Sequence, residues 1–343
     1  MKKLLKWLGR SVLFVVILFL VTILVLSCVR VPMYRTFLNR AENEVLIPGL
    51  DAPYCPQGLA YVSKDQTYLF TGYMTDKTAS RIYVVNAEEK VGMVTLENLD
   101  GTPFLGHVGG VAVHDDSIYI ATDQRVYMLP YQKTKQKAYE ETTVSIKMDC
   151  SFPVHNEASF VFANEEGLWV GEFYLKGKYE TDVSHESTTK DGSTSHAWIE
   201  CFPFAKNDGT DEEDALPYGL NSLLPSRILA VREKVQGFAI DDKGRFYLSC
   251  SYSIKHSYLY QYRAIEDNDS DRTATISDKS IPVFDLDSTR LLKKTRVMPM
   301  SEDLDYANGK IYINFESACK KYRLFNIYST KHVMSYQIED DLA

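Results

Sequence analysis

The sequence lacks the short motifs that mark the commonest catalytic and phosphate-binding sites. It contains no Gly-x-Ser-x-Gly nucleophile elbow, no P-loop, no dinucleotide-binding fingerprint and no His-Glu-x-x-His pattern. Nothing in the chain therefore signals the usual machinery of serine hydrolases, nucleotide-binding proteins or zinc peptidases. A function has to be inferred from residues that lie apart in the sequence and that the fold brings together.

Cysteine is scarce, with six residues in 343 and no Cys-x-x-Cys pair. One of them, Cys28, lies in an apolar N-terminal segment, and the others are Cys55, Cys150, Cys201, Cys250 and Cys319. Five scattered cysteines argue against both a full disulfide framework and a zinc ribbon. One or two disulfides in an oxidising compartment and a set of buried free thiols are both open.

Acidic residues are absent from the first 40 positions, which hold seven lysines and arginines. The whole chain has a net charge of -8, so the rest of it is considerably more acidic than this figure suggests. An acidic surface repels the phosphate backbone of DNA and RNA, and we therefore expect no nucleic-acid partner. The composition favours cations, carbohydrates, peptides or neutral small molecules as ligands.

Charge is also missing from Ser11 to Val29, a mostly apolar run that follows Lys2, Lys3, Lys6 and Arg10. As a helix this run would be roughly as long as the hydrocarbon core of a bilayer is thick. We predict a basic cytoplasmic segment at 1–10, a transmembrane anchor at 11–29, a juxtamembrane stalk at 30–43 and an extracytoplasmic domain at 44–343 of a single-pass protein of the cell membrane.

Two features bear on whether this anchor is cleaved. The run is longer than the apolar core of a cleavable signal peptide, and no Ala-x-Ala site follows it, so an uncleaved signal-anchor is expected. The alternative is a lipoprotein anchored at Cys28, because Val25-Leu26-Ser27-Cys28 resembles a bacterial lipoprotein box. Both leave the domain tethered outside the cytoplasmic membrane.

A strand-like segment recurs five times along the rest of the chain, and each copy is followed by a second strand. The copies start at Gln57, Gly109, Glu157, Gln236 and Glu302. Repeats of roughly 50 residues, built of short strands, are typical of propeller blades. We therefore predict an all-β fold, a five-bladed β-propeller, with six blades as the alternative because the third interval is long enough to hide one.

The outer strands follow from the same alignment. We expect the fourth strand of the second blade at 143–148 and that of the fourth blade at 282–286. In the last blade the third strand is expected at 323–328, and the fourth is either 332–337 or a strand from the N-terminal side of the domain, near 44–48. An N-terminal strand in that place would close the ring and remove an exposed sheet edge.

In a propeller the start of each first strand and the end of each second strand lie at the same mouth of the ring. Aligned first-strand starts and the positions just before them contribute His107, His155, Glu157 and Glu302, our candidates for catalytic residues. Predicted ligand-binding residues are Gln57, Gln236, Asp123, Glu172, Ser251 and Glu316. The repeat thus predicts one site at one channel mouth.

Several carboxylates at one mouth repel one another unless a cation or hydrogen-bond donors compensate. A divalent cation held by Glu157 and Glu302 is the simplest solution, and hard oxygen ligands favour calcium. Participation of His107 and His155 would favour zinc or another transition metal. The bland alternative is that polar residues at the mouth hold ordered water.

One segment carries a resemblance to a known group of propellers. Val235-Gln-Gly-Phe-Ala-Ile-Asp-Asp-Lys-Gly-Arg-Phe-Tyr-Leu resembles the blade consensus of lactonase-like and strictosidine-synthase-like propellers, and Cys55-Pro-Gln-Gly-Leu-Ala-Tyr is similar to it. The likeness covers about 44–340 at superfamily level. It implies a calcium ion in the channel, with Glu302 or Glu157 at the position of that family's glutamate and Gln57 and Gln236 where asparagine is usual.

Together these patterns predict a membrane-anchored extracytoplasmic propeller that acts as a ligand-binding or scaffolding module through its channel mouth. The ligand would be a small molecule, a carbohydrate or a protein. The alternative function is a metal-assisted hydrolase of an ester, lactone or phosphoester, with the converging acids and imidazoles as metal ligands or general base. The sequence leaves open whether the protein is an enzyme.

Overall fold

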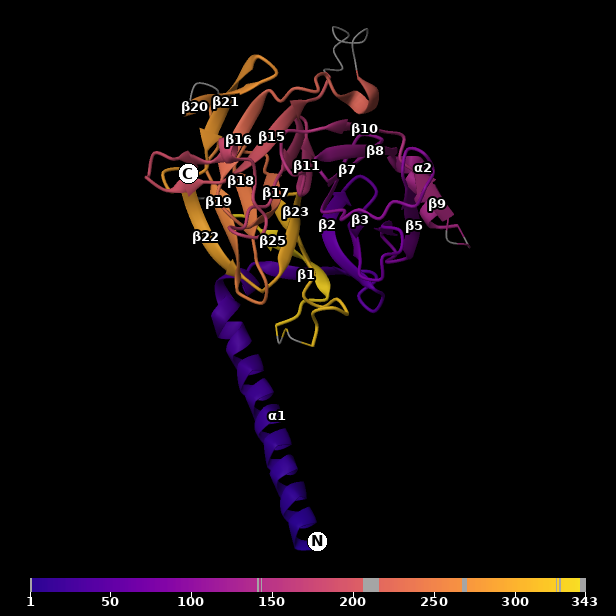
Figure 1. The fold of residues 1–343 in the computed structure, drawn as a ribbon, viewed down its shortest axis with the longest axis vertical. Helices are drawn as coiled ribbons and strands as arrows, with labels where there is room; N and C mark the ends of the chain where they lie inside the picture. The colour runs from indigo at the N-terminus through magenta and orange to yellow at the C-terminus, as the bar shows by residue number, and fades with distance from the viewer. Residues whose placement is uncertain are drawn as a thin grey trace.

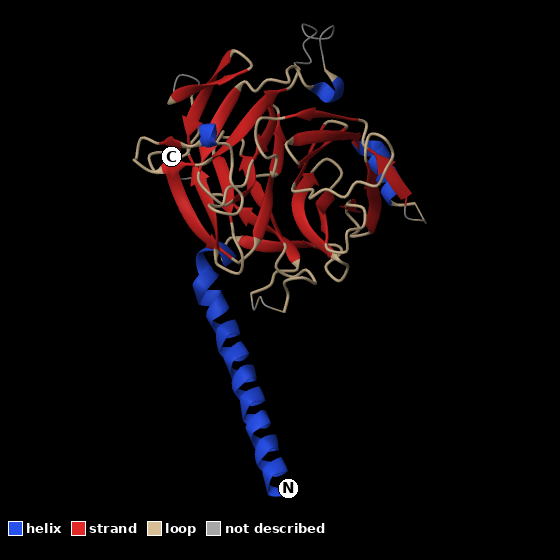
Figure 2. Cartoon of the chain, in the orientation of Figure 1, coloured by secondary structure: helices blue, strands red, loops and turns tan. Residues whose placement is uncertain are grey.

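The chain folds into a β-rich body carried on one long helix, as Figures 1 and 2 show. The computed structural model describes residues 2–140, 142, 144–205, 216–266, 270–324, 326 and 328–339. Within them the strands form five large sheets and one small two-stranded ribbon.

The five sheets are the blades of one closed ring. Their innermost strands are β2 (Tyr54–Val62), β6 (Gly110–His114), β11 (Phe160–Asn164), β17 (Val235–Ile240) and β23 (Ser301–Ala307). Each of these strands contacts the next one around the ring, and β23 returns to β2. The predicted all-β, five-bladed propeller is therefore confirmed, and the described residues form no sixth blade.

Glycine allows the inner strands to approach one another closely at two starts. A Cβ on Gly58 would lie 2.8 Å from the backbone nitrogen of Val111, and one on Gly237 would lie 2.6 Å from that of Leu304. Such distances are too short for any side chain next to a backbone that cannot move aside. The glycines that follow Gln57 and Gln236 therefore serve the packing between blades.

Blade 1 begins with β2 and continues outward. Its further strands are β3 (Thr67–Met74), β4 (Arg81–Val85), β5 (Val91–Glu97) and β9 (Val144–Lys147). Strand β9 pairs in parallel with β5, so it belongs to blade 1, although we predicted 143–148 as the fourth strand of blade 2. Parallel pairing needs a crossover, and α2 (Tyr131–Ala138) supplies it by packing against β5.

Blade 2 takes its fourth strand from the segment that follows the crossover. Outward from β6 it consists of β7 (Ser117–Thr122), β8 (Arg125–Pro130) and β10 (Cys150–Pro153). Strand β10 pairs antiparallel with β8 through Cys150 opposite Met128 and Pro153 opposite Arg125. The outer edge of blade 2 therefore lies later in the chain than we predicted.

Blade 3 is the widest sheet. Outward from β11 it consists of β12 (Gly167–Gly171), β15 (Ala197–Pro203), β16 (Arg227–Val231), β21 (Lys279–Asp285) and β20 (Arg272–Ile276). The segment between β12 and β15 holds the short helix η1 (Val183–His185) and the ribbon of β13 (Ser187–Thr188) with β14 (Thr194–Ser195), and η2 (Pro217–Gly219) precedes β16.

Blade 4 differs from the prediction in its outer strand. Outward from β17 it consists of β18 (Phe246–Cys250), β19 (Ser257–Tyr262) and β22 (Leu291–Val297). The segment predicted for this place, 282–286, lies within β21 and pairs in parallel with β16 of blade 3. Strand β22 carries three basic residues, which hinder the pairing of an edge strand with another chain. The same residues interrupt the apolar alternation from which strands are predicted, and β22 was therefore missed.

Blade 5 joins the two ends of the domain. Outward from β23 it consists of β24 (Lys310–Phe315), β25 (His332–Gln337) and β1 (Ala41–Leu46). The N-terminal strand therefore closes the ring, and 332–337 is the third strand. The predicted third strand at 323–328 is wrong, because its described residues form turns and bends after β24.

Helix α1 (Lys2–Leu38) extends from the propeller as a separate rod (Figure 1). Its stretch Lys6–Val25 has a mean hydropathy of 2.7 and is not buried by the rest of the protein. Its last turns pack on the propeller, where Tyr34 Oη lies 2.7 Å from His256 Nδ1 and Phe37 stacks on Tyr336. An exposed apolar helix of this length is found in membrane anchors and in signal sequences.

Candidate functional site

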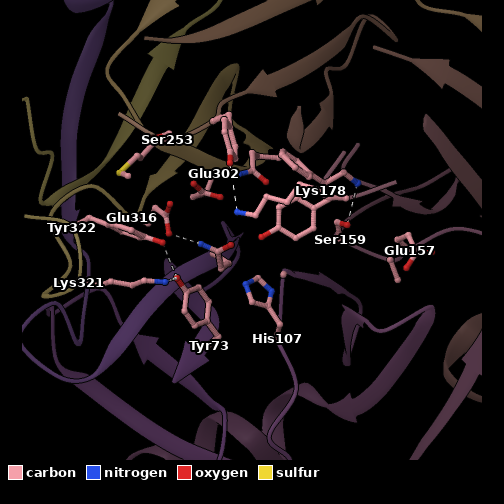
Figure 3. Close-up of a pocket in the computed structure, with 18 of the residues that line it drawn as sticks. Tyr73, His107, Glu157, Ser159, Lys178, Ser253, Glu302, Glu316, Lys321 and Tyr322 are labelled. Carbon is pink, nitrogen blue, oxygen red and sulfur yellow. Dashed lines mark hydrogen bonds between the residues drawn. The ribbon is translucent and has the colours of Figure 1, made fainter. Parts of the chain in front are cut away.

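A cavity of about 780 Å³ opens at the channel mouth where the first strands start. Figure 3 shows side chains from several blades pointing into it. The predicted residues that line it are Gln57, His107, Asp123, Glu157, Gln236, Glu302 and Glu316. The alignment of repeats thus predicted the position of these seven residues, while their roles stay predictions.

Three predicted residues do not line the cavity. Glu172 is fully buried, with Oε1 2.6 Å from His185 Nδ1, and it accepts the backbone N–H groups of Trp198 and Glu157. Ser251 is buried and accepts a hydrogen bond from the Ser257 hydroxyl. Both side chains are used by the protein itself.

His155 is the third predicted residue outside the cavity lining. Its Nδ1 lies 2.9 Å from Oε1 of the buried Glu200, and its backbone N–H donates to Oε2 of the same carboxylate. This contact raises the pKa of His155, because the Glu200 side chain accepts a hydrogen bond from the imidazolium. His155 is therefore engaged by Glu200 of blade 3 and does not line the cavity with His107.

Two carboxyl groups form the floor of the cavity. Glu302 lies near the start of β23, and Glu316 directly follows β24, so antiparallel pairing of these strands brings them together. Gln57 Nε2 donates a 3.0 Å hydrogen bond to Glu316 Oε2. Oε1 of the buried Glu302 has no hydrogen-bond donor among the residues that the structure describes.

Burial shifts both carboxyl groups toward the protonated form. Burial is the main reason why the pKa of Glu316 rises to about 8, with a further contribution from Cys319. The pKa of Glu302 rises well above its usual value because of burial and then because of the Glu316 charge. Two carboxylates without a cation cannot both be ionised at low cost, so near neutral pH they share a proton.

An aromatic wall stands beside this floor. Tyr73 Oη lies 3.1 Å from Tyr322 Oη and accepts a 2.8 Å hydrogen bond from Lys321 Nζ. The His107 ring stacks on Tyr73 with 4.5 Å between centroids. Our sequence reasoning did not name Tyr73, although Tyr73 ends the second strand of the first repeat, the position that supplied Asp123, Glu172, Ser251 and Glu316 from the others.

The rim opposite this wall comes from the segment between β12 and β15 and from the loop after β18. Lys178 Nζ lies 4.9 Å from the centre of the Tyr179 ring and 3.5 Å from Tyr252 Oη, an interaction drawn in Figure 3. These three residues line the cavity. No sequence signal identified them, because their segments fall outside the repeat and reach the mouth only through their loop conformations.

The predicted metal ligands Glu157 and Glu302 both line the cavity. Glu157 Oε1 accepts a 3.0 Å hydrogen bond from Gln124 Nε2 near the solvent, whereas Glu302 lies on the buried floor. No group of three His, Cys, Asp or Glu side chains in the described part of the chain is arranged to hold a metal ion. Divalent-cation binding, with calcium first, stays a prediction.

The comparisons with known proteins concern the fold of this chain and say nothing about its function. No protein-family model and no curated protein matches the chain. Among solved structures, the PQQ-bound aldose sugar dehydrogenase of Streptomyces coelicolor is 16% identical with a TM-score of 0.40, covering 80% of this chain and 78% of that one. The glutaminyl cyclase of Myxococcus xanthus is 7% identical with a TM-score of 0.42, covering 87% and 97%.

A putative oxidoreductase (glucose dehydrogenase) of Thermus thermophilus is 11% identical with a TM-score of 0.41, covering 86% of this chain and 99% of that one. At such identities and scores we draw no argument about function from these likenesses. The chain is a β-propeller similar to several others, and no specific family, lactonase-like or otherwise, is shown for it.

Proposed function

We propose that this protein is a membrane-anchored extracytoplasmic propeller that binds a small organic cation, such as an amine or a guanidinium compound, in its channel mouth. The observation that carries the proposal is the carboxyl pair of the buried Glu302 and the half-buried Glu316 on the floor of an open cavity, with no basic side chain hydrogen-bonded to it among the described residues. A cation would replace the proton that the pair shares.

The rest of the lining supports a positively charged ligand. Five acidic residues and two lysines line the cavity, and Tyr73, Tyr252 and Tyr322 offer ring faces on which a cation can lie. The volume is within the range of small-molecule sites. Net acidity of the propeller would also draw cations toward the mouth from solution.

The test uses the full chain in detergent and calorimetric titration with arginine, putrescine and choline, and with glucose as a neutral probe. Because a cation displaces the shared proton, we expect affinity for the effective probe to rise as pH increases from 6 to 8.5, with proton release. Glu316→Gln should weaken binding at least about tenfold, the effect of one buried charged contact, and flatten this pH dependence.

The matched control is Glu88→Gln, which removes a carboxylate from an exposed turn outside the cavity and should bind like the parent protein. Binding of no cation at millimolar concentration would contradict the proposal. Preferential binding of glucose, unchanged in Glu316→Gln, would instead indicate a carbohydrate site on the tyrosine wall.

A second candidate function is hydrolysis of an ester, lactone or phosphoester. The observation that favours it is the pKa of Glu316, raised to about 8, because a carboxyl group that exchanges its proton near neutral pH can act as general acid and base. In the metal-assisted form Glu302 and Glu157 would hold a divalent cation, calcium first, that polarises the substrate.

Assays with p-nitrophenyl acetate, a γ-lactone and p-nitrophenyl phosphate, each with and without Ca²⁺, Mg²⁺, Mn²⁺ or Zn²⁺, test this candidate. Turnover that falls in both Glu302→Gln and Glu316→Gln would support it. No turnover, together with no thermal shift by any of the four ions, would contradict it. Elemental analysis of the purified protein reports a retained metal independently.

The membrane anchor is the other part of the proposal. Helix α1 begins with basic residues and is apolar from Lys6 to Val25, which supports a membrane anchor, and its end packs on the propeller through Tyr34 and Phe37. The intact mass of membrane-extracted protein should then be 39.1 kDa. A shorter, lipid-modified chain that begins at Cys28 would support the lipoprotein alternative.

A further inference from the structure

We propose that Cys55 and Cys319 form a disulfide bond that joins the first and last blades beneath the cavity. Cys55 lies in β2 of blade 1, and Cys319 follows β24 of blade 5. Their Sγ atoms are 3.3 Å apart, and both residues are completely buried. In the described part of the chain these are the only two thiols in contact with each other.

The position of this pair gives the bond a structural purpose. Blades 1 and 5 meet where the ring closes, and β23 and β2 are already joined there by Asp303 and Asp305, whose carboxylates accept the backbone N–H groups of Leu59 and Tyr61. A covalent link at this junction would tie together positions that are 264 residues apart. Closing so long a loop restricts the unfolded chain strongly.

The same link would fix one wall of the cavity. The turn that contains Cys319 also carries Lys321 and Tyr322, and Glu316 accepts the backbone N–H of Cys319 through its carbonyl. Attaching Cys319 to a first strand would therefore hold the floor and the aromatic wall at a set distance. This consequence rests on the proposed binding function, whereas the bond itself does not.

The geometry needs little adjustment to form the bond. A disulfide has its sulfurs about 2.05 Å apart, so each sulfur atom would move by less than about 1 Å. The thiolate is the form that attacks in thiol–disulfide exchange.

The oxidant is a separate molecule of the compartment in which the domain folds. We infer that it is a thiol oxidoreductase that carries a disulfide and acts outside the cytoplasmic membrane. The Cys319 thiolate attacks the disulfide of the oxidant and releases one thiolate from it. The Cys55 thiolate then attacks Cys319 Sγ and releases the oxidant, which has accepted two electrons and takes up the two protons lost by the cysteines. Because both sulfurs are buried in the finished propeller, this exchange takes place before the ring closes.

The experiment extracts the full-length protein from membranes into denaturant that contains iodoacetamide, so that buried free thiols also react. The protein is then reduced, the newly exposed thiols are labelled with a second reagent, and both labels are mapped by mass spectrometry. We expect the second label on Cys55 and Cys319 and the first on the other four cysteines. In thermal unfolding, reductant should lower the Tm of the parent protein by roughly 5 °C. A Cys150→Ser control should keep this response, and a Cys55→Ala/Cys319→Ala double variant should lose it.

A second preparation keeps the outcomes distinct. Protein refolded with reduced and oxidised glutathione forms the bond wherever the natural chain resides, so a bond found here and absent from membrane extracts would support the pairing and overturn the extracytoplasmic location. First label on Cys55 and Cys319 in both preparations would overturn the disulfide. Neither result depends on a ligand, so failure of the cation-binding proposal leaves this test unaffected.

Discussion

Glu172 of blade 3 and Glu316 of blade 5 each directly follow the second strand of their blade, yet they have opposite surroundings. Glu172 is surrounded by donors from His185, Trp198 and Glu157. Glu316 receives one donor from Gln57 and has a second carboxyl group, Glu302, as its neighbour. One carboxylate is saturated by the protein, and the other faces a cavity.

The difference arises from hairpin register and from the segment that follows each second strand. In the aligned hairpins Phe173, which lines the cavity, corresponds to Glu316, and Glu172 lies one residue earlier. In blade 3 the chain between β12 and β15 folds into η1 and a ribbon, and this insertion places His185 against Glu172 and under Trp198. In blade 5 the turn after β24 places Lys321 and Tyr322 at the side of the cavity and covers neither carboxyl group. Register therefore decides which residue after a second strand lines the cavity, and the insertion supplies a donor that saturates Glu172.

The largest effect is expected when the saturated carboxylate is removed. Glu172→Ala leaves the buried His185 side chain and two backbone N–H groups without their acceptor, at a cost of about 3 kcal/mol in the free energy of unfolding. Urea unfolding followed by circular dichroism measures this loss. Glu316→Gln keeps the shape of its side chain and removes a costly buried charge, so it should be neutral or slightly stabilising.

Equal losses in these two variants would remove the distinction between a structural and an available carboxylate. A loss of unfolding free energy below about 0.5 kcal/mol for Glu172→Ala would also remove the distinction, because ordinary surface substitutions cost that little. His185→Phe provides a matched check from the other side of the contact: it should also destabilise blade 3, because Glu172 then keeps its charge without its imidazole partner.

The comparison also explains which parts of the molecule could be predicted from the sequence. Inner strands and their hairpins depend on local alternation and turn residues such as Asn308-Gly309, so the five blades and the positions of Glu302 and Glu316 followed from the repeat. The blade assignments of the outer strands β9 and β21 could not be predicted from the repeat. Each pairs in parallel with a strand of another blade than predicted, and this pairing depends on crossover connections that lie outside the repeat.

The same limit applies to the site. Gln57 and Glu302 could be placed because they start inner strands, whereas Lys178 and Tyr252 reach the rim through loops whose shape depends on tertiary contacts. Nor could the sequence identify the partner of Glu172, since His185 lies in an insertion without a recognisable pattern. The position of a repeat residue was predictable, and its hydrogen-bond partners were not.

A pH series sharpens the comparison with an intermediate effect. Burial raises the pKa of Glu316 to about 8 and that of Asp305 to about 7, so the folded protein keeps protons that the unfolded chain has lost. The folded state therefore binds more protons than the unfolded state between about pH 4.5 and 8, and stability falls as pH rises through this window. At about 1.4 kcal/mol per pH unit for each proton retained, we expect a decrease of several kcal/mol from pH 5 to pH 8.

Urea unfolding at several pH values, without added cations, measures this slope. Glu316→Gln should reduce it, because the substituted amide does not titrate, while Glu88→Gln should leave it unchanged. Stability that rises over the same interval would show that the carboxyl pair is ionised in the folded protein and that some other group already compensates its charge.

The smallest effect is expected for the pair of His155 and Glu200. This pair is intermediate between the saturated Glu172 and the available Glu316, because Glu200 is buried while the His155 side chain is 37% exposed. Glu200 raises the pKa of His155, so the pair stabilises the folded state fully below pH 6.5 and loses this contribution as pH rises through the higher folded value. Solvent screening limits the gain to a few tenths of a kcal/mol. The NMR titration of the His155 ring should therefore have its midpoint above 6.5, and His155→Gln should lose only this small stability difference between pH 6 and 8. A midpoint at or below 6.5 would mean that the hydration of the exposed ring outweighs the hydrogen bond to Glu200. Burial of both partners, as in His185 and Glu172, would then be needed for a carboxylate of blade 3 to hold a histidine.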